Sequence, residues 1–394
     1  MLIELVLALM MGIIAGTFTG LTPGIHINLI AAIILSLTGV FPPTAFLIFI
    51  VAMSVTHTFL DFIPSIFLGA PDEDTALGVL PGHEFLLKGQ GHEAVLLTVI
   101  GSSISIILLI LITPLFILAI PKVFPFIQRM MGFILIWISF FLVYNEKDTK
   151  LLSLIIFLLA GFLGISSMNL SSNSLLPSLT GLFGSSTLIY SIQQKTIVPK
   201  QKIGKLILNK KELIRPAIAT TLVSPIFSFL PGLGSSQAAI VSSQIIKQSK
   251  KQFLILLGSI NTFVVSVSFL SLYLINKSRT GVASAIQQTM TITPKDLALV
   301  YIAIIISAII SVFLTIKISK IFARNIHKIN YSKISLAVLI LLTIVIILFS
   351  GFYGFLIFVV STLLGLSCTY LGVRKGFLTG SLLIPTILFY LPFV

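Results

Sequence analysis

Long apolar runs, separated by short clusters of proline, glycine and charged residues, dominate the chain. A helix needs about 20 apolar residues to cross a bilayer, and most of these runs approach that length. We therefore expect membrane-spanning helices in both halves of the chain. The expected spans lie near residues 44–60, 94–118, 127–144, 151–168 and 174–192 in the first half, and near 252–276, 297–316, 334–350, 352–371 and 376–394 in the second.

One further apolar segment, residues 216–246, is interrupted at its centre by Pro231 and Gly232. Lys and Arg residues flank it on both sides, so the positive-inside rule places both flanks in the cytoplasm. A segment whose two ends share a side cannot span the membrane. Its arms of about 15 residues correspond to about 22 Å of helix, which is short for a hydrocarbon core of about 30 Å. We expect a re-entrant hairpin with Pro231 and Gly232 at its tip.

The segment 1–40 has the same construction around Pro23 and Gly24, but no Lys or Arg flanks it, so this hairpin is expected to enter from outside. The odd number of spans between the two hairpins inverts the second half relative to the first. The sequence therefore predicts an all-α polytopic membrane protein with two inverted repeats, each a re-entrant hairpin plus about five transmembrane helices. The first repeat is expected to cover residues 1–200 and the second residues 201–394.

A short internal match also suggests a duplication. Gly69 precedes Lys88 by the interval at which Gly258 precedes Lys277, and each glycine follows a leucine. If the two glycines are equivalent, their different distances from the Pro-Gly steps mean that one half has gained or lost a helical segment.

Composition excludes a soluble fold. Hydrophobic residues make up 57% of the 394 residues and charged residues only 9%, against about 25% charged in ordinary soluble domains. The net charge of +14 is attributed to orientation and to anionic membrane lipids, because no basic platform with interleaved aromatic residues points to nucleic acid. The single cysteine, Cys368, excludes an intramolecular disulfide. Glu4 stands where a signal peptide carries positive charge, so the first apolar segment is expected to remain in the mature protein.

The two Pro-Gly steps are the candidate substrate site. Irregular backbone at membrane depth requires a protein-lined cavity, and a helix that begins there directs free N–H groups and its positive dipole end at the centre, which favours an anion. The alternative is that the Pro-Gly steps merely kink ordinary spans. The candidate substrate-binding residues are Thr22, Pro23, Gly24, His26 and Asn28 at the first tip and Pro231, Gly232, Gly234, Ser235 and Ser236 at the second, with Asn28, Ser235 and Ser236 as candidate helix caps.

More than half of the eleven acidic residues lie between residues 61 and 93. Carboxylates beside a cavity can bind Na⁺ or carry protons, whereas the alternative is a solvated cytoplasmic loop. Asp61 and Asp72 border apolar runs and are the candidate ion-coupling residues, with Asn261 as a third candidate. His57 lies four residues before Asp61 on the same helix face, either as a proton relay or as a structural pair.

The sequence does not predict an enzyme. Only His57 with Asp61 offers an acid and base that converge in the membrane, and the chain has no Gly-x-Ser-x-Gly or phosphate-binding glycine-loop motif. The doubled His-Glu pairs at 83–84 and 92–93 lack the His-Glu-x-x-His pattern, so no metal site is expected. No cofactor is expected beyond Na⁺ or H⁺ as a coupling ion. A scaffold protein would not need two hairpins.

Residues 20–24 (Gly-Leu-Thr-Pro-Gly) and 229–234 (Phe-Leu-Pro-Gly-Leu-Gly), with the stretch 69–91 between them, resemble the large membrane subunit of tripartite tricarboxylate transporters, the TctA family. The similarity runs through nearly the whole chain and is greatest to the shorter archaeal-type members. The acidic residues at 72–74 stand where that family tends to have small and hydroxylated residues.

The resemblance implies a secondary carrier for carboxylates in the cell membrane, driven by an ion gradient. It also implies two partners, a small membrane subunit and an extracytoplasmic binding protein, and a homodimer is a further expectation. Carriers of lipid-linked phosphate in another family with Pro-Gly repeats are similar in plan. A polyprenyl-phosphate-like lipid is therefore the alternative substrate to an anionic small molecule.

Overall fold

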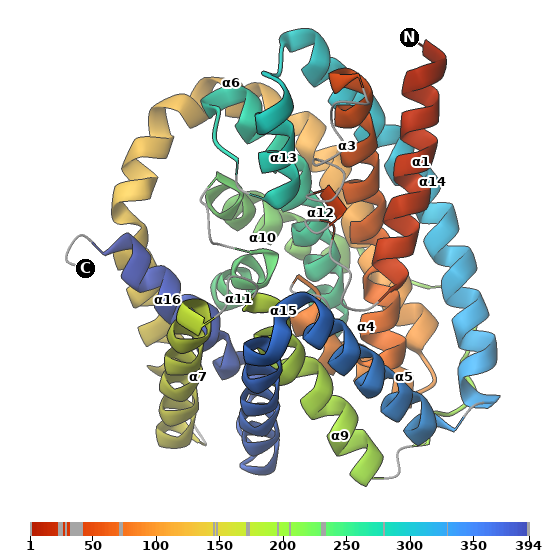
Figure 1. The fold of residues 1–394 in the computed structure, drawn as a ribbon, viewed down its shortest axis with the longest axis vertical. Coiled ribbons are helices and arrows are strands. Elements are labelled where there is room, and N and C mark those ends of the chain that lie inside the picture. Colours follow the sequence, from red (N-terminus) through yellow and green to blue (C-terminus); the bar gives the residue numbers. More distant parts are fainter. Residues whose placement is uncertain are drawn as a thin grey trace.

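The computed structural model describes residues 2–22, 27, 30–31, 42–70, 74–144, 146, 149–170, 174–194, 197–204, 206–229, 234–278, 280–328 and 330–391 (Figure 1). Every regular element in these residues is helical, which confirms the all-α fold. Among the described residues, eight helical segments are long and apolar enough to cross a membrane. The chain is therefore a multi-pass membrane protein, as its hydropathy predicts.

The helices of the first half occupy most of its described residues. They are α1 (Leu2–Leu21), α3 (Pro43–Leu60), α4 (Phe62–Leu68), η2 (Ala76–Gly78), α5 (Val79–Leu87), α6 (Gly91–Tyr144), α7 (Lys150–Leu170), α8 (Leu175–Leu179), the π-helical η3 (Thr180–Ser185) and α9 (Ser186–Gln193).

The second half continues with a similar alternation of long and short helices. They are α10 (Lys210–Phe229), α11 (Ser235–Ile245), α12 (Lys250–Ile275), α13 (Gly281–Thr289), α14 (Pro294–Asn325), η4 (Ile326–Lys328), α15 (Tyr331–Tyr370), η5 (Lys375–Thr379) and α16 (Gly380–Tyr390).

Two pairs of expected spans are joined in single long helices. α6 runs for 54 residues through three prolines and contains both the second and the third expected span. α15 runs for 40 residues but has a non-helical residue, Gly351, with φ 63° and ψ −161°. Glycine accepts this positive φ without a steric penalty. The break falls between the expected spans 334–350 and 352–371, so α15 consists of two helical segments.

The order of elements is compatible with a duplicated chain. α3, Asp61 and α4 together cover 26 residues, as does α12, and each of these stretches is followed by a residue in the left-handed conformation, Gly69 (φ 64°) or Asn276 (φ 48°). In the first half the short 3-10 helix η2 and the nine-residue α5 come next, and in the second half the nine-residue α13. A long helix then follows in each half, α6 or α14. In this alignment Gly69 corresponds to Asn276, whereas Gly258 lies inside α12. Gly69 and Gly258 thus have different positions in their helices, and the structure gives their proposed equivalence no support.

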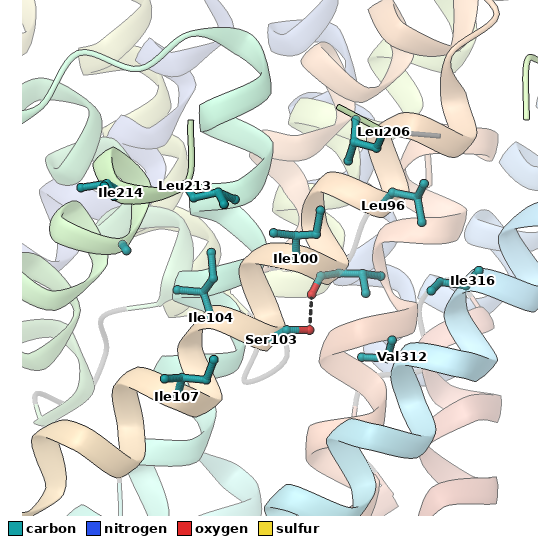
Figure 2. Close-up of a pocket in the computed structure, with 12 residues that line it drawn as sticks. Leu96, Ile100, Ser103, Ile104, Ile107, Leu206, Leu213, Ile214, Val312 and Ile316 are labelled. Atoms are coloured by element: carbon teal, nitrogen blue, oxygen red, sulfur yellow. Dashed lines mark hydrogen bonds between the residues drawn. The ribbon is translucent and has the colours of Figure 1, made fainter. Parts of the chain in front are cut away.

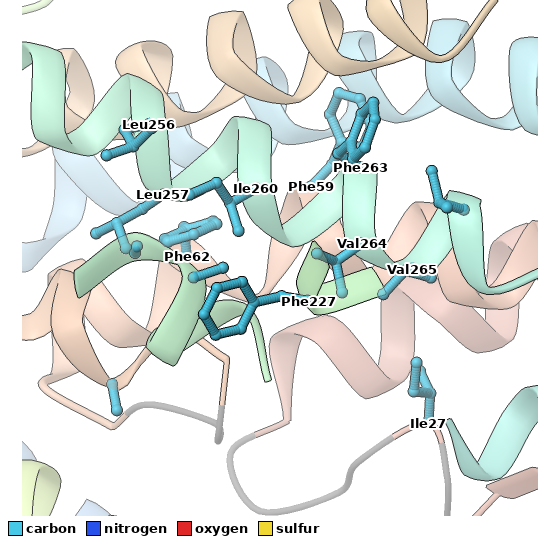
Figure 3. Close-up of a cluster of buried hydrophobic side chains, with 14 of the residues drawn as sticks. Ile27, Phe59, Phe62, Phe227, Leu256, Leu257, Ile260, Phe263, Val264 and Val265 are labelled. Atoms are coloured by element: carbon cyan, nitrogen blue, oxygen red, sulfur yellow. The ribbon is translucent and has the colours of Figure 1, made fainter. Parts of the chain in front are cut away.

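α3 and α12 form the centre of the molecule. In the span Pro43–Leu68, which contains α3 and α4, and in α12, 94% of the most apolar window is buried, against 22–33% in α1, α6, α14 and α15, whose exposed apolar faces suit lipid. Figure 3 shows how the two halves share one core: Phe59 and Phe62 from the first half lie close to Phe263 of α12 and Phe227 of α10. α10 and α11, the helices of the expected second hairpin, pack on each other and on α12.

The two helices of this hairpin differ in length. α10 begins at Lys210, earlier than expected, and its 20 residues correspond to about 30 Å, whereas the 11 residues of α11 correspond to about 16 Å. The expectation of two equal arms of about 15 residues was therefore wrong. Pro216, where the hairpin was expected to begin, and Pro225 both lie inside α10. The first helix of the hairpin therefore starts about one and a half turns before Pro216. α11 is too short to cross the hydrocarbon core alone.

Glycine residues bring the central helices into close contact. A Cβ atom on Gly101 of α6 would lie 1.9 Å from the carbonyl oxygen of Ile255 in α12, and a Cβ atom on Gly258 of α12 would lie 2.1 Å from the carbonyl oxygen of Thr98 in α6. Real Cβ atoms do not approach oxygen this closely. Small residues at such crossings let two membrane helices pack backbone against backbone.

α1 packs on α3 in the same way. Gly12, Gly16 and Gly20 follow one another at every fourth position on the face that contacts α3. A Cβ atom on Gly12 would lie 2.5 Å from the Phe49 carbonyl oxygen, and one on Gly16 would lie 2.4 Å from the Met53 carbonyl oxygen. Residues four apart lie on one helix face, so the three glycines form a continuous groove for α3.

Candidate functional site

The N-terminus of α11 is the part of the predicted second tip that the structure describes. The helix begins at Ser235, and the preceding residue, Gly234, has extended backbone angles (φ −92°, ψ 176°). The side-chain oxygen of Gln237 accepts a hydrogen bond of 2.6 Å from the Gly234 N–H. Gly234 is therefore the N-cap residue. The expectation that Ser235 or Ser236 caps this helix was wrong, because both residues lie inside its first turn.

A carboxylate already lies at this helix end. The backbone N–H of Ser235 donates to Asp74 Oδ1 at 3.2 Å, and the Ser235 hydroxyl donates to the same oxygen. Asp74 belongs to the segment between α4 and α5, 161 positions earlier in the chain. The positive end of a helix dipole and its free N–H groups attract such a group. The predicted anion site at α11 is thus occupied by an anionic side chain of the protein itself.

A second polar cluster lies where α3 meets α4. Asp61 is the residue between these two helices, and it is only 2% exposed. Its Oδ2 accepts a hydrogen bond of 2.8 Å from Asn261 Nδ2 of α12 and lies 3.9 Å from His57 Nε2. His57 Nδ1 in turn lies 3.0 Å from Thr19 Oγ1 of α1. The structure therefore brings together Asp61 and Asn261, which the sequence proposes separately as ion-coupling residues.

The same crossing contains further polar atoms. The hydroxyl oxygens of Thr58 and Thr262 lie 3.0 Å apart between α3 and α12. Asn261 is 1% exposed, and in the described part of the chain its Oδ1 has no hydrogen-bond partner. A buried carbonyl oxygen without a donor is costly. This oxygen is therefore available to a cation or a water molecule.

Several candidates of the first tip and of the acidic segment cannot be placed. At the end of α1, the Thr22 hydroxyl donates to the Phe18 carbonyl oxygen at 2.8 Å, a bond internal to the helix end. The other predicted site residues lie outside the described residues: Pro23, Gly24, His26, Asn28, Asp72, Pro231 and Gly232.

The acidic residues between positions 61 and 93 lie in different environments. Glu84 and Glu93 form ion pairs with Lys250 at 2.6 Å and Lys251 at 2.7 Å, at the start of α12. The hydrogen bond from Lys250 lowers the pKa of the exposed Glu84 carboxyl. These two residues fit the alternative of a solvated, ion-paired surface, whereas Asp61 is buried in the core.

No group of three His, Cys, Asp or Glu side chains suited to a metal ion occurs among the described residues. The pocket in Figure 2, with a volume of about 550 Å³, is also unsuited to an anion. It lies between α6, α10 and α14, and its lining is apolar except for Ser103, whose hydroxyl donates to the Val99 carbonyl oxygen at 2.8 Å. Ile107 and Ile214 at this pocket are more than half exposed, so the pocket is a groove on the apolar surface.

Lys375 is a buried polar residue that no sequence pattern singled out. It follows Arg374 in a short basic stretch between two apolar runs, which is typical of a cytoplasmic loop, but it is only 6% exposed. Its Nζ donates to the hydroxyl oxygens of Ser186 at 3.0 Å and Thr187 at 2.7 Å in α9. A Lys next to an Arg gives no sign in the sequence that one of the two is buried.

The long apolar helices and the buried polar crossing of α3 with α12 define a multi-pass membrane protein with a polar centre. The family model described as "Tripartite tricarboxylate transporter TctA family" matches residues 6–379, and the chain belongs to this family. It is 30% identical over 398 residues to "Uncharacterized protein MJ1079" of Methanocaldococcus jannaschii, with 98% of each chain covered. No solved structure matches the chain.

Family membership confirms the resemblance seen in residues 20–24 and 229–234. It makes the chain a component of a tricarboxylate transporter, of the type that forms the large membrane subunit. A transporter family is also consistent with the expectation that the chain is not an enzyme.

Proposed function

We propose that the chain is a secondary carrier in the cell membrane that moves an anionic solute, a di- or tricarboxylate, coupled to Na⁺ or H⁺. The observation that carries this proposal is the bond between Ser235 and the carboxylate of Asp74. A helix end that accommodates a carboxylate side chain has the donors and the dipole to bind a carboxylate of a solute. During transport the solute would take the place of Asp74.

The proposed substrate site extends beyond α11. Gly234 and Ser236 flank Ser235, which contacts Asp74, and the Pro-Gly step at 231–232 precedes them by one residue in the chain. By analogy between the two halves, Thr22, Pro23, Gly24, His26 and Asn28 would supply the opposing helix end. Such a site binds an anion with backbone N–H groups.

The proposed coupling site is the cluster of Asp61, Asn261 and His57. The Thr19 hydroxyl donates to the Gly16 carbonyl oxygen at 3.2 Å, so the contact between Thr19 and His57 is donated by Nδ1–H of the ring. His57 Nε2 faces Asp61 Oδ2 across 3.9 Å. A coupling proton or cation bound at this crossing would have the Asp61 carboxylate and the buried Asn261 Oδ1 as ligand atoms.

We also propose that the carrier works with a small membrane subunit and an extracytoplasmic binding protein. Membership of a tripartite family supports both partners. Assembly as a homodimer remains an expectation from the sequence.

Counterflow tests the substrate class. Proteoliposomes that contain the purified chain and are loaded with unlabelled citrate are expected to take up external ¹⁴C-citrate, because exchange needs the substrate site but no gradient. Excess unlabelled citrate added outside should compete with the uptake of ¹⁴C-citrate, and acetate should not. Protein-free liposomes are the control. Failure to exchange citrate or malate, together with saturable binding of undecaprenyl phosphate, would favour the lipid-phosphate alternative and reject a carboxylate carrier.

Replacement of the internal carboxylate should strengthen binding of the solute. Asp74→Asn removes a negative charge from the α11 N-terminus but keeps an acceptor for Ser235. Charges at helix ends are worth about 0.3–1 kcal/mol, so the citrate concentration for half-maximal counterflow is expected to fall about two- to fivefold. Glu84→Gln, an exposed ion-paired carboxyl, is the matched control. A higher half-maximal concentration in Asp74→Asn would mean that Asp74 helps to build the site.

A further inference from the structure

Lys375 lies at a junction of several helices. It is the first residue of η5, which packs against α7, α15 and α16, and its ammonium group reaches α9 in the first half of the chain. Its neighbour Arg374 has a 74% exposed side chain that lies 3.4 Å from Glu146. Two consecutive basic residues thus have opposite environments, one paired at the surface and one buried.

The hydroxyl groups around Lys375 accept its hydrogen bonds. Ser186 and Thr187 donate their own hydroxyl hydrogens to the carbonyl oxygens of Leu182 and Phe183, one turn earlier. Each hydroxyl therefore offers a lone pair to the ammonium group. An ammonium group has three N–H donors, and these two bonds, at 3.0 and 2.7 Å, use two of them. The third donor has no acceptor in the described part of the chain.

No carboxylate of the described residues balances the positive charge of Lys375. Within the described residues, no Asp or Glu oxygen lies within the 4.0 Å of an ion pair with Lys375 Nζ. The other titratable groups beside it are His83 and Cys368, and Cys368 Sγ donates to the Val373 carbonyl oxygen. His83 and a protonated Cys368 bring no negative charge. A buried charge without a partner is strongly disfavoured, so an anion would be stabilised here.

The surroundings connect Lys375 to the α11 site. His83 Nε2 lies 3.4 Å from Ser191 Oγ, one turn after Thr187 on α9, and Leu188 of α9 packs on Ala70. Ala70 and His83 belong to the stretch of chain from which Asp74 reaches the start of α11. α9 also follows directly on the π-helical η3, a local irregularity that is frequent at functional sites.

We propose that Lys375, Ser186 and Thr187 form a binding site for an anionic group, namely a carboxylate of the transported solute. The identity of the ligand rests on the proposed function, whereas the site itself rests on the unbalanced buried ammonium group. The site binds its anion through a side-chain ammonium group, unlike the backbone N–H groups at α11. A carrier with both sites prefers solutes that have two or more carboxylates over acetate.

The proposal is tested by the thermal stability of the detergent-purified chain with and without anions. The variants are Lys375→Met, which keeps the length and apolar stem of the side chain, Thr187→Val, which removes one hydroxyl, and Arg374→Gln as the exposed control. Each is titrated with citrate, malate, phosphate, sulfate and acetate in the presence of EDTA, with sodium chloride at matched ionic strength as the reference.

The expected result has two parts. Without anions, Lys375→Met should melt at the same temperature as the parent or higher, because an unpaired buried charge is removed. Its half-maximal citrate concentration should rise at least tenfold, that of Thr187→Val should rise several-fold, and Arg374→Gln should match the parent. A purely structural lysine would instead lower the melting temperature and leave the response to citrate unchanged.

The remaining outcomes separate the site from the substrate class. A parent that responds to phosphate or sulfate but not to citrate, with the response lost in Lys375→Met, supports the site and contradicts the carboxylate. A parent stabilised by none of the anions, or a Lys375→Met variant with the parent's response, overturns the site. If Lys375→Met fails to fold, an unchanged citrate response in folded Thr187→Val overturns it as well, and a weakened response supports it. The counterflow experiment still decides the proposed function independently.

Discussion

Asp61→Asn is expected to abolish gradient-driven accumulation of citrate in proteoliposomes while citrate counterflow continues. Asp61 is buried and hydrogen-bonded to Asn261 of α12, and it lies 3.9 Å from His57 Nε2. An amide in its place keeps the size of the side chain but cannot bind a proton and is a weak ligand for Na⁺. The helix-end site at Ser235 is not altered by this change. Exchange therefore persists at a substantial fraction of the parent rate, whereas accumulation falls more than tenfold.

A control variant for Asp61→Asn should remove a carboxyl group that lies outside the buried cluster. Glu84→Gln is suitable because Glu84 is 41% exposed at its side chain and pairs with Lys250 at the surface, so it should accumulate citrate like the parent. Asn261→Ala should resemble Asp61→Asn, since it removes both the hydrogen bond to Asp61 and the buried Oδ1 that α12 brings to the cluster. If Asp61→Asn and Asn261→Ala both accumulate citrate normally, the cluster is a structural contact and coupling occurs elsewhere.

Gly101→Val is expected to prevent the assembly of the helical core. A Cβ atom at this position would lie 1.9 Å from the Ile255 carbonyl oxygen, and the clash involves the backbone of two long helices that cannot move apart without opening the centre of the molecule. Overpacking of a core costs about 1–3 kcal/mol or more. Gly258→Val, from the opposite side of the crossing, should have the same effect. Size-exclusion chromatography in detergent should show aggregated protein or a strongly lowered yield.

The control for this prediction is Gly204→Val. A Cβ atom on Gly204 would meet no atom within 4 Å, so this variant should elute and melt like the parent. Monodisperse Gly101→Val protein with the parent's melting temperature would contradict the close crossing of α6 and α12.

Much of the fold follows from hydropathy. The apolar runs mark the helices because backbone groups in lipid must be hydrogen-bonded within a helix. The break in α15 could be expected as well, because it falls at Gly351, a glycine between two apolar runs. Asp61 and Asn261 could be singled out because polar side chains are costly inside a membrane. Their mutual contact was not predicted, since it depends on how α3 crosses α12.

The missed features depend on contacts between distant parts of the chain. Asp74 and Ser235 are 161 positions apart, and nothing local to either residue indicates the other. Lys375 has the flanking pattern of an ordinary cytoplasmic loop, and only the packing of η5 against other helices buries it. The cap at Gly234 was misassigned because Gly and Ser are both frequent N-cap residues. By contrast, Gly12, Gly16 and Gly20 are a signal that local sequence does contain, since small residues spaced by four mark close helix packing.

The most direct measurement of the central claim is accumulation of ¹⁴C-citrate by proteoliposomes of the parent chain under an imposed inward Na⁺ or H⁺ gradient. The internal citrate concentration is expected to rise above the external one with one of the two gradients, and to return to equilibrium when an ionophore collapses that gradient. The site at the α11 N-terminus and the cluster around Asp61 together require this result. Folded, reconstituted protein that equilibrates citrate but never concentrates it under either gradient would contradict a cation-coupled carrier.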